Sequence, residues 1–258
     1  MSVDRAKNVF PEPEWATDFS KFVSVYPDFL SHSTYHEMAY SIHISLRNKL
    51  IFFEIPKNAS SSVKTMLHHI EYDNVSYSHS TQADLHSRSF SPLLTPFQVR
   101  DFGDLLADPS FLKFCIFRDP FERLVSAYRD KIVVNGQFHQ EIRSLTGTRG
   151  TEYPSFKEFL YWIANQKVSD MDSHWRPQYL QSYLYAVPSM RVLSMDRMAD
   201  INTAIKTHLG TDKFSLGKIA PHATTHKVDL KAEYDEPSAD LVRKKFSEDF
   251  VIWNKLHD

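Results

Sequence analysis

Two short polar turns in this sequence carry the residue types that hold phosphate-like anions. The first lies in residues 51–67, IFFEIPKNASSSVKTML, where an apolar run leads into Lys57, a polar turn and a helical pattern. Backbone N–H groups in the first turn of a helix are unpaired, and the helix dipole favours negative charge there. Ser60, Ser61 and Ser62 add hydroxyl donors, and Lys57 adds a full positive charge. The pattern predicts a binding site for a phosphate or a sulfate.

An ordinary strand–turn–helix with capping serines and a solvated lysine would show the same residues, because serines are common at helix starts. The nucleoside triphosphate loop, GxxxxGK[ST], places its lysine after the glycines, at the helix start. Here Lys57 comes before the turn, and the turn contains no glycine. An ATPase or GTPase loop is therefore a poor match.

The second turn lies in residues 114–132, FCIFRDPFERLVSAYRDKI. Arg118 ends an apolar run, and Ser126 follows eight positions later, about two helical turns on. A guanidinium at a strand end and a hydroxyl on the following helix can clamp a second phosphate from two sides. The alternative for Arg118 is an ion pair with Glu122 at the helix terminus. Arg123, Arg129 and Lys131 are expected to be structural or solvent-facing.

The elements that must position these turns alternate along the chain. Three short apolar runs, at residues 49–55, 111–117 and 190–195, are typical of strands buried in a parallel sheet. With helices between them, they predict an α/β, P-loop-like three-layer fold, whose central, mainly parallel sheet is flanked by helices. Ligands of such sheets bind beyond the carboxyl ends of the strands. We therefore expect Lys57 and Arg118 to face the same edge.

Helical spacing defines the expected helices. Val63, Met66, Leu67 and Ile70 fall on one face of the first helix. The second helix has an N-cap signal in Asp119, followed by proline at the first helical position. The remaining expected segments are a helix around residues 156–163, a helix closing near Gly210, a last helix within 238–256, and mostly loop over 73–100.

Composition limits the domain organisation and the partners. The 258 residues are 42% hydrophobic and 14% aromatic, which suffices for a proper core. We expect a single domain over residues 1–258, with residues 1–45 as a peripheral N-terminal segment. The formal charge of −2 argues against nucleic acid as a partner, since such binders carry a basic excess. Any anion site must be local, and nothing in the sequence indicates an oligomeric state.

Compartment signals are few. The single cysteine, Cys115, lies in an apolar run and has no partner for an internal disulfide, which fits a reducing compartment. No apolar stretch approaches the roughly 20 residues of a membrane helix. The first residues lack the apolar segment of a signal peptide. The expectation is a cytoplasmic protein without a membrane span.

At these two turns the sequence resembles the sulfotransferases that use 3′-phosphoadenosine 5′-phosphosulfate (PAPS), with its closest likeness to the carbohydrate branch (chondroitin, HNK-1 and uronyl 2-O enzymes). In that family a PK-x-x-[ST]-like turn binds the 5′-phosphosulfate, and an RDPFERLVSAYR-like segment binds the 3′-phosphate through its arginine and serine. DSHWRPQ, residues 172–178, is a third family-like element. The resemblance implies that PAPS, or the product PAP, is bound by Lys57, Asn58, Ala59, Ser60, Ser61, Ser62, Arg118 and Ser126.

The chain departs from the family pattern at two points. Ala59 stands where many relatives carry glycine, and we expect no counterpart of the membrane anchor of the Golgi members in this sequence. The second departure concerns the substrate rather than the chemistry. A late polar stretch, PHATTHK at residues 221–227, is similar in place to a loop that closes over the nucleotide in relatives, which makes Lys227 a further nucleotide-binding candidate.

Sulfuryl transfer resembles phosphoryl transfer, an in-line displacement in which charge builds on the leaving phosphate oxygen. Lys57 is expected to stabilise that charge, and the reaction requires no metal in principle. The acceptor hydroxyl must lose a proton to a base within hydrogen-bond reach. His86 is the first candidate, because related uronyl 2-O-sulfotransferases carry a similar H-x-R pattern. His174 is the second candidate for base or acceptor contact, and Glu54 is a third that more readily pairs with a cation.

The sequence therefore predicts a sulfotransferase that moves the sulfuryl group from PAPS to a hydroxyl of a carbohydrate or other small molecule. Arg88 and Arg176, with His174, are the candidates for holding the acceptor; the two arginines would otherwise bridge loops. Two alternatives remain at this point: a nucleotide-binding module without catalysis, and a small-molecule kinase. The kinase is disfavoured by the misplaced lysine of the first turn and by the absence of a clear apolar strand ending in a magnesium-binding aspartate.

Overall fold

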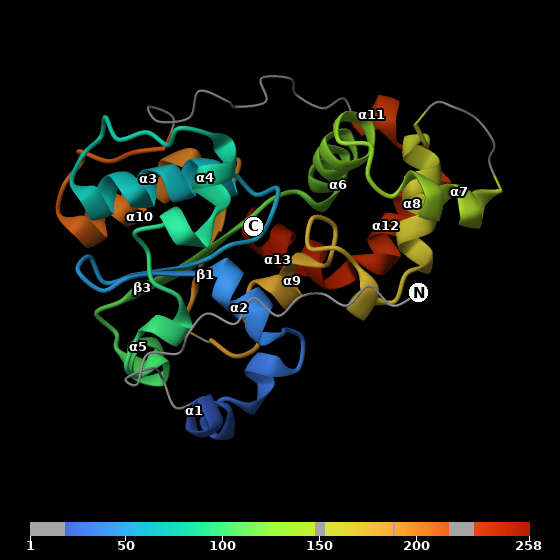
Figure 1. Cartoon of the computed structure of the whole chain (residues 1–258). Coiled ribbons are helices and arrows are strands. Elements are labelled where there is room, and N and C mark those ends of the chain that lie inside the picture. The colour runs from blue at the N-terminus through green and yellow to red at the C-terminus, as the bar shows by residue number, and fades with distance from the viewer. Residues whose placement is uncertain (1–18, 148–152, 188, 217–229) are drawn as a thin grey trace.

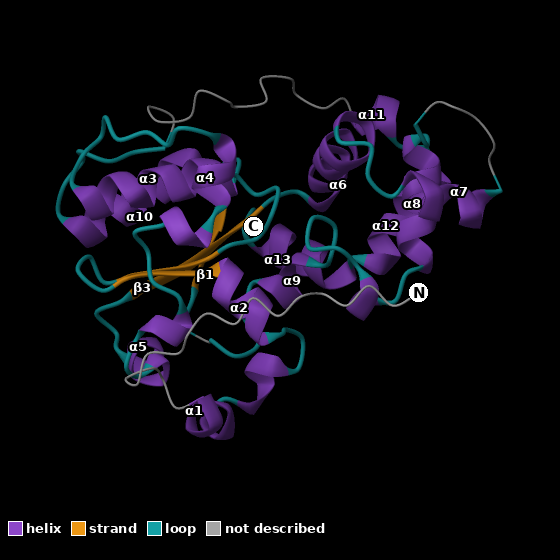
Figure 2. Cartoon of the chain, in the orientation of Figure 1, coloured by secondary structure: helices purple, strands orange, loops and turns teal. Residues whose placement is uncertain are grey.

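The computed structural model describes residues 19–147, 153–187, 189–216 and 230–258. Its sheet contains β1 (Ile42–Ser45), β2 (Leu50–Phe53), β3 (Leu112–Phe117) and β4 (Arg191–Ser194), in that spatial order. Strands β2, β3 and β4 are parallel, and β1 pairs antiparallel with β2 at the edge (Figure 2). The prediction of an α/β fold with a mainly parallel sheet is confirmed. Lys227 lies outside the described residues.

Helices cover both faces of the sheet (Figure 1). On one face lie α3 (Ser60–Tyr72) and α10 (Met198–Leu209), and on the other lie α1 (Phe19–Val25), α2 (Tyr35–Ser41) and α5 (Phe102–Ala107). These layers explain why β2 and β3 read as continuous apolar runs, since both strands are buried on both faces.

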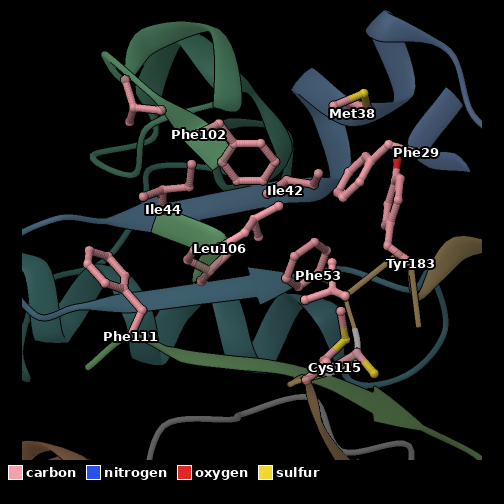
Figure 3. Packing of buried hydrophobic residues seen from close by; sticks show 14 of the residues in the cluster. Phe29, Met38, Ile42, Ile44, Phe53, Phe102, Leu106, Phe111, Cys115 and Tyr183 are labelled. Carbon is pink, nitrogen blue, oxygen red and sulfur yellow. The ribbon is translucent and has the colours of Figure 1, made fainter. Parts of the chain in front are cut away.

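Alternate strand residues contribute to the two cores. Phe52 and Phe114 pack in the cluster under α3 and α10. Phe53 and Cys115 point the other way, toward residues such as Phe102 (Figure 3). Burial raises the pKa of the Cys115 thiol, so this side chain behaves as a small apolar group.

A helical part adjoins the sheet and holds the third core cluster. It includes α6 (Pro120–Tyr128), α7 (His139–Thr146), α8 (Phe156–Asn165), α12 (Glu236–Lys245) and α13 (Ser247–Lys255) (Figure 1). Aromatic side chains of this cluster surround the fully buried Trp175. The other short elements are η1 (Pro27–Leu30), α4 (Gln82–His86), η2 (Arg88–Phe90), η3 (Pro96–Gln98), η4 (Arg129–Val134), η5 (Val168–Asp170), α9 (Gln178–Gln181) and α11 (Leu230–Glu233).

Most expected elements are present. The three predicted strands are β2, β3 and β4, and the four apolar residues predicted for the first helix are all buried on α3. Asp119 caps α6 as predicted, because its carboxylate accepts from the Glu122 N–H at 3.0 Å. Gly210 ends α10 with a φ of 67°, a conformation that glycine adopts at little cost.

The structure corrects two expectations. Residues 1–45 are not wholly peripheral: β1 pairs with β2, and Phe29 and Met38 are completely buried. Phe22, Phe29 and Met38 help to fill the face of the sheet opposite α3, which no periodicity revealed. The last helix is two helices, α12 and α13, because the chain breaks at the buried Phe246.

Among the described residues, no helix is both long and apolar enough to cross a membrane.

Candidate active site

The first turn has a strained backbone. Lys57 has a φ of 72° and Ala59 a φ of 58°, values in the left-handed region that cost energy for residues other than glycine. Ala59 is the N-cap of α3 and offers no side-chain cap to the first helical turn. The turn therefore leaves the helix N-terminus open for an anion.

Side chains of the turn hold it in this shape. The Asn58 amide is buried and donates to Ile116 O at 2.7 Å, and the Ser60 hydroxyl donates to Ile55 O at 2.8 Å. Of the six residues assigned to the nucleotide in the first turn, Asn58 and Ser60 thus act on the protein itself. Lys57, Ser61 and Ser62 keep partly exposed side chains.

The second turn lies against the first. The Arg118 guanidinium donates to Lys57 O at 3.2 Å, and Arg123 donates to Pro56 O at 3.0 Å. The expectation that Lys57 and Arg118 meet at one edge of the sheet is therefore confirmed. Arg123 is completely buried and also donates to Arg176 O and Ser173 O, which makes it structural, as expected.

Gln178 joins the two turns. Its side-chain oxygen accepts from Asn58 Nδ2 at 2.6 Å and from the Arg118 N–H at 3.0 Å, and its amide donates to Arg118 O at 2.9 Å. Its own N–H donates to the buried Asp249 carboxylate. The segment 172–178 is family-like in sequence, but the sequence predicts no role for Gln178. Its partners Arg118 and Asn58 lie 60 and 120 positions away.

Both cations of the turns have acidic partners. Lys57 Nζ lies 2.8 Å from Asp130 Oδ2, and Arg118 Nε lies 3.4 Å from Glu122 Oε2. Burial lowers the pKa of Lys57, and the Asp130 carboxylate opposes that shift. The ion pair weighed for Arg118 exists, and Arg118 also lines a pocket. Ser126 is partly exposed on α6.

The pocket beside Arg118 has a volume of about 230 Å³. Its walls come from the ends of β3 and β4, from α6 and from α13, and are formed by Arg118, Asp119, Glu122, Met195, Asp196 and Trp253. It therefore lies beyond the carboxyl ends of parallel strands, where ligands of such sheets bind.

His86 lies next to the first turn and is engaged at both ring nitrogens. Nε2 is 3.0 Å from Ser61 Oγ, and Nδ1 is 2.7 Å from Lys64 Nζ. An ammonium can only donate, so Nδ1 accepts and Nε2 carries the proton that it donates to Ser61. Burial, helped by the charge of Lys64, lowers the pKa of His86 to about 4.

A buried charge network supports His86 from behind. Lys64 Nζ lies 2.9 Å from Glu54 Oε1, and Glu54 Oε2 lies 2.7 Å from His43 Nε2. Burial alone would raise the pKa of Glu54, but Lys64 and His43 outweigh it and hold the pKa well below its usual range. Glu54 therefore pairs with the cation Lys64, which is the role that the sequence analysis favoured over that of a base.

His174 is arranged differently. Its Nδ1 lies 2.6 Å from Asp172 Oδ1, so Nδ1 carries the proton, and no bond from any described residue to Nε2 is found. Burial would raise the pKa of Asp172, but the hydrogen bonds from His174 outweigh it and lower the pKa. A carboxylate that fixes one nitrogen and leaves the other open is the arrangement of a general base.

The two acceptor-binding candidates contact protein groups here. Arg176 donates to Glu37 Oε1 at 2.7 Å and to His32 O, which ties α2 to the loop before α9. Arg88 donates to His43 Nδ1 and to two backbone carbonyls. Loop bridging, the alternative considered for both arginines, thus describes their contacts in this structure, and their acceptor role stays a prediction.

Residues 40–255 match the family described as "Sulfotransferase family". This chain belongs to the sulfotransferase family. It is 30% identical over 112 residues to carbohydrate sulfotransferase 10 of Xenopus laevis, covering 42% of this chain and 31% of that protein. It is 28% identical over 154 residues to the human protein of that name, covering 52% of this chain and 42% of the relative.

A third relative of this sulfotransferase chain is carbohydrate sulfotransferase 14 of Mus musculus, 31% identical over 106 residues, covering 37% of this chain and 28% of that protein. The chain thus aligns with less than half of the length of each of these relatives. No solved structure matches it significantly. The family membership confirms the resemblance that the two turns indicated.

Proposed function

We propose that this protein is a sulfotransferase that moves the sulfuryl group from PAPS to a hydroxyl group of a carbohydrate. The observation that carries the proposal is the direct contact between the two turns, which brings Lys57 and Arg118 to one sheet edge in a chain of this family. The names of the relatives support a carbohydrate acceptor.

The residues present fit a nucleotide with two separate anionic groups. Lys57, the partly exposed Ser61 and Ser62, and the uncapped first turn of α3 would hold the 5′-phosphosulfate. Arg118 and Ser126 would hold the 3′-phosphate, and the pocket beside Arg118 offers room for the adenosine. PAPS itself would supply the activated sulfuryl group. Lys57 would neutralise the charge that builds on the oxygen between phosphate and sulfate.

A base must accept the proton of the acceptor hydroxyl, and we propose His174 for this role. Its Nε2 lone pair is open, and Asp172 would stabilise the imidazolium that forms. His86, which donates to Ser61 and accepts from Lys64, would instead orient a hydroxyl of the phosphate-binding turn. This reverses the order in which the two histidines were ranked on sequence alone.

A transfer assay tests the proposal. The purified protein is incubated with PAPS carrying radioactive sulfur and a panel of mono- and oligosaccharides, and labelled product is counted. Lys57→Ala is expected to lower the rate by about 10²- to 10³-fold. Lys206 is an exposed lysine on α10 that pairs with Asp212, and Lys206→Ala should leave the rate unchanged. Wild-type protein that binds PAPS but sulfates none of the sugars would contradict the carbohydrate acceptor.

A further inference from the structure

The chain beyond α6 has an unusual winding. After Tyr128 it continues as a π-helix, η4, over Arg129–Val134 rather than ending. Such turns are rare and are found frequently at functional sites. This one brings Asp130 to Lys57, 73 positions earlier in the chain. Nothing in the amino-acid pattern of the segment indicated that contact.

Asp130 is held on Lys57 by its own neighbours. Its Oδ2 lies 2.8 Å from Lys57 Nζ and 3.5 Å from Lys131 Nζ. Its other oxygen, Oδ1, accepts from Asn135 Nδ2 at 2.8 Å, and Asn135 also donates to the Asp130 carbonyl at 2.6 Å. The carboxylate is thus fixed from one side and directed at the lysine from the other.

Asp130 is ionised at neutral pH. Burial would raise the pKa of its carboxyl group, but the hydrogen bond and charge of Lys57, with the charge of Lys131, outweigh burial and lower the pKa. The Lys57 side chain is only 17% exposed, so solvent screens this ion pair less than a surface pair. The pair therefore competes directly with any anion that needs the Lys57 ammonium.

We propose that Asp130 is a positioning residue that holds Lys57 in the resting enzyme and releases it to the incoming 5′-phosphate group. Binding is then an exchange of counter-ions, in which the nucleotide replaces a carboxylate on the lysine. Two consequences follow: Lys57 stays oriented on its strained turn before the nucleotide arrives, and the nucleotide binds more weakly than it would to an unpaired ammonium. This inference rests on the proposed function, since it concerns the same nucleotide site.

The same segment offers a weaker counterpart. Glu122 pairs with Arg118 at 3.4 Å, a longer contact than the 2.8 Å between Asp130 and Lys57, so the attraction within that pair is weaker. The exchange should therefore be dominated by Asp130, which makes this residue the one to change.

Calorimetric titration with PAP tests the exchange. Asp130→Asn keeps the size of the side chain but removes the charge, and it should tighten PAP binding by roughly 3- to 10-fold at low salt. In a Lys57→Met background the same substitution should change the affinity by less than about 2-fold, because no ion pair remains to break. General charge repulsion between Asp130 and the nucleotide would instead persist without Lys57.

Two further variants complete the test. Asn135→Ala, at an exposed position, removes the hydrogen bond that holds the Asp130 carboxylate but keeps the carboxylate. It should tighten PAP binding by a smaller factor than Asp130→Asn. This variant keeps the test decisive if Asp130→Asn unfolds. Glu233→Gln removes the same charge from the neighbouring Arg129 pair and should leave PAP affinity unchanged.

The outcomes separate the two claims. Wild-type protein that does not bind PAP would overturn the proposed function and the exchange together. PAP binding that depends on Lys57 but is unchanged or weakened by Asp130→Asn and by Asn135→Ala would overturn the exchange alone. A gain in affinity that persists fully in the Lys57→Met background would overturn it as well.

Discussion

His86 and His174 show how the surroundings of a ring decide its chemistry. His86 accepts from an ammonium and donates to a hydroxyl, so neither nitrogen is open to take a proton. His174 donates to the Asp172 carboxylate through Nδ1, and among the described residues its Nε2 has no hydrogen-bond partner. His86 was a candidate through the H-x-R pattern of relatives, and His174 through its place in the family-like segment DSHWRPQ. Their partners, which the sequence does not show, distinguish them.

Alanine substitutions of the two histidines should therefore differ in effect. His174→Ala removes the proposed base, and the turnover rate at saturating PAPS is expected to fall by about 10²- to 10⁴-fold. His86→Ala should lower it by less than about 10-fold, through a less ordered Ser61. Turnover of both variants is measured with the best acceptor, after PAP binding has shown that the nucleotide site is intact. A larger loss in His86→Ala than in His174→Ala would return His86 to the role of base.

The residues of the two turns could be recognised from the sequence because their chemistry is local. A lysine, serines and an arginine at strand ends supply the positive charge and hydrogen-bond donors that anion binding requires. The strain at Lys57 and Ala59, with φ values of 72° and 58°, could not be predicted in the same way. Contacts from distant segments maintain it.

Single elements connect the site to the fold, and α9 is the clearest case. This four-residue helix begins with Gln178, whose side chain bridges Asn58 and Arg118. Its N-terminus is capped by Asp249 of α13, which accepts from the N–H groups of Gln178 and Tyr179. The helix thus links α13 to the two turns that carry Lys57 and Arg118.

Gln178→Leu should damage both stability and nucleotide binding. The substitution leaves the Arg118 N–H and C=O without the Gln178 side chain, and we expect a loss of about 2–4 kcal/mol in the free energy of unfolding. PAP affinity should fall as well, because the two turns lose their link. Gln181→Leu on the same helix removes one bond to Arg176 O and should cost about 1 kcal/mol. Urea unfolding compares the variants, and equal losses in both would contradict the bridging role.

Elements that depend on distant packing escaped the sequence analysis. Strand β1 is four residues long and reads as part of a mixed segment, yet it completes the sheet. The π-helix after α6 has the apolar spacing of an ordinary helix up to Ile132. Neither shows a local signal, because the edge pairing of β1 and the Lys57–Asp130 contact exist only in the folded chain.

The molecule as a whole places several histidines where they cannot be charged. His43 and His68 are almost completely buried, and the pKa of each is lowered, mainly by burial, to about 3 from an ordinary value of 6.5. Charges nearby, Arg88 for His43 and His79 for His68, act in the same direction. His43 lies on β1 and His68 on α3. Each contacts the segment around η2, His43 through Arg88 and His68 through Ser91.

These histidines should make the protein sensitive to acid. Because their folded pKa lies below the unfolded one, their contribution to stability is present above about pH 6.5 and is lost as the pH falls toward about 3. Between about pH 7.5 and about pH 5, each should lower the free energy of unfolding by about 2 kcal/mol. His68→Gln should reduce this loss, and His36→Gln at an exposed position should not. Urea unfolding at the two pH values would contradict the account if all three proteins lost equal stability.

The central claim is that the edge of the sheet at Lys57 and Arg118 is a site for a nucleotide with a 3′-phosphate, and calorimetric titration with PAP, ADP and AMP tests it most directly. We predict PAP binding with a dissociation constant on the order of micromolar, a loss of that binding in Arg118→Ala, and no measurable binding of ADP. Equal affinity for PAP and ADP, or PAP binding that survives Arg118→Ala unchanged, would contradict the account.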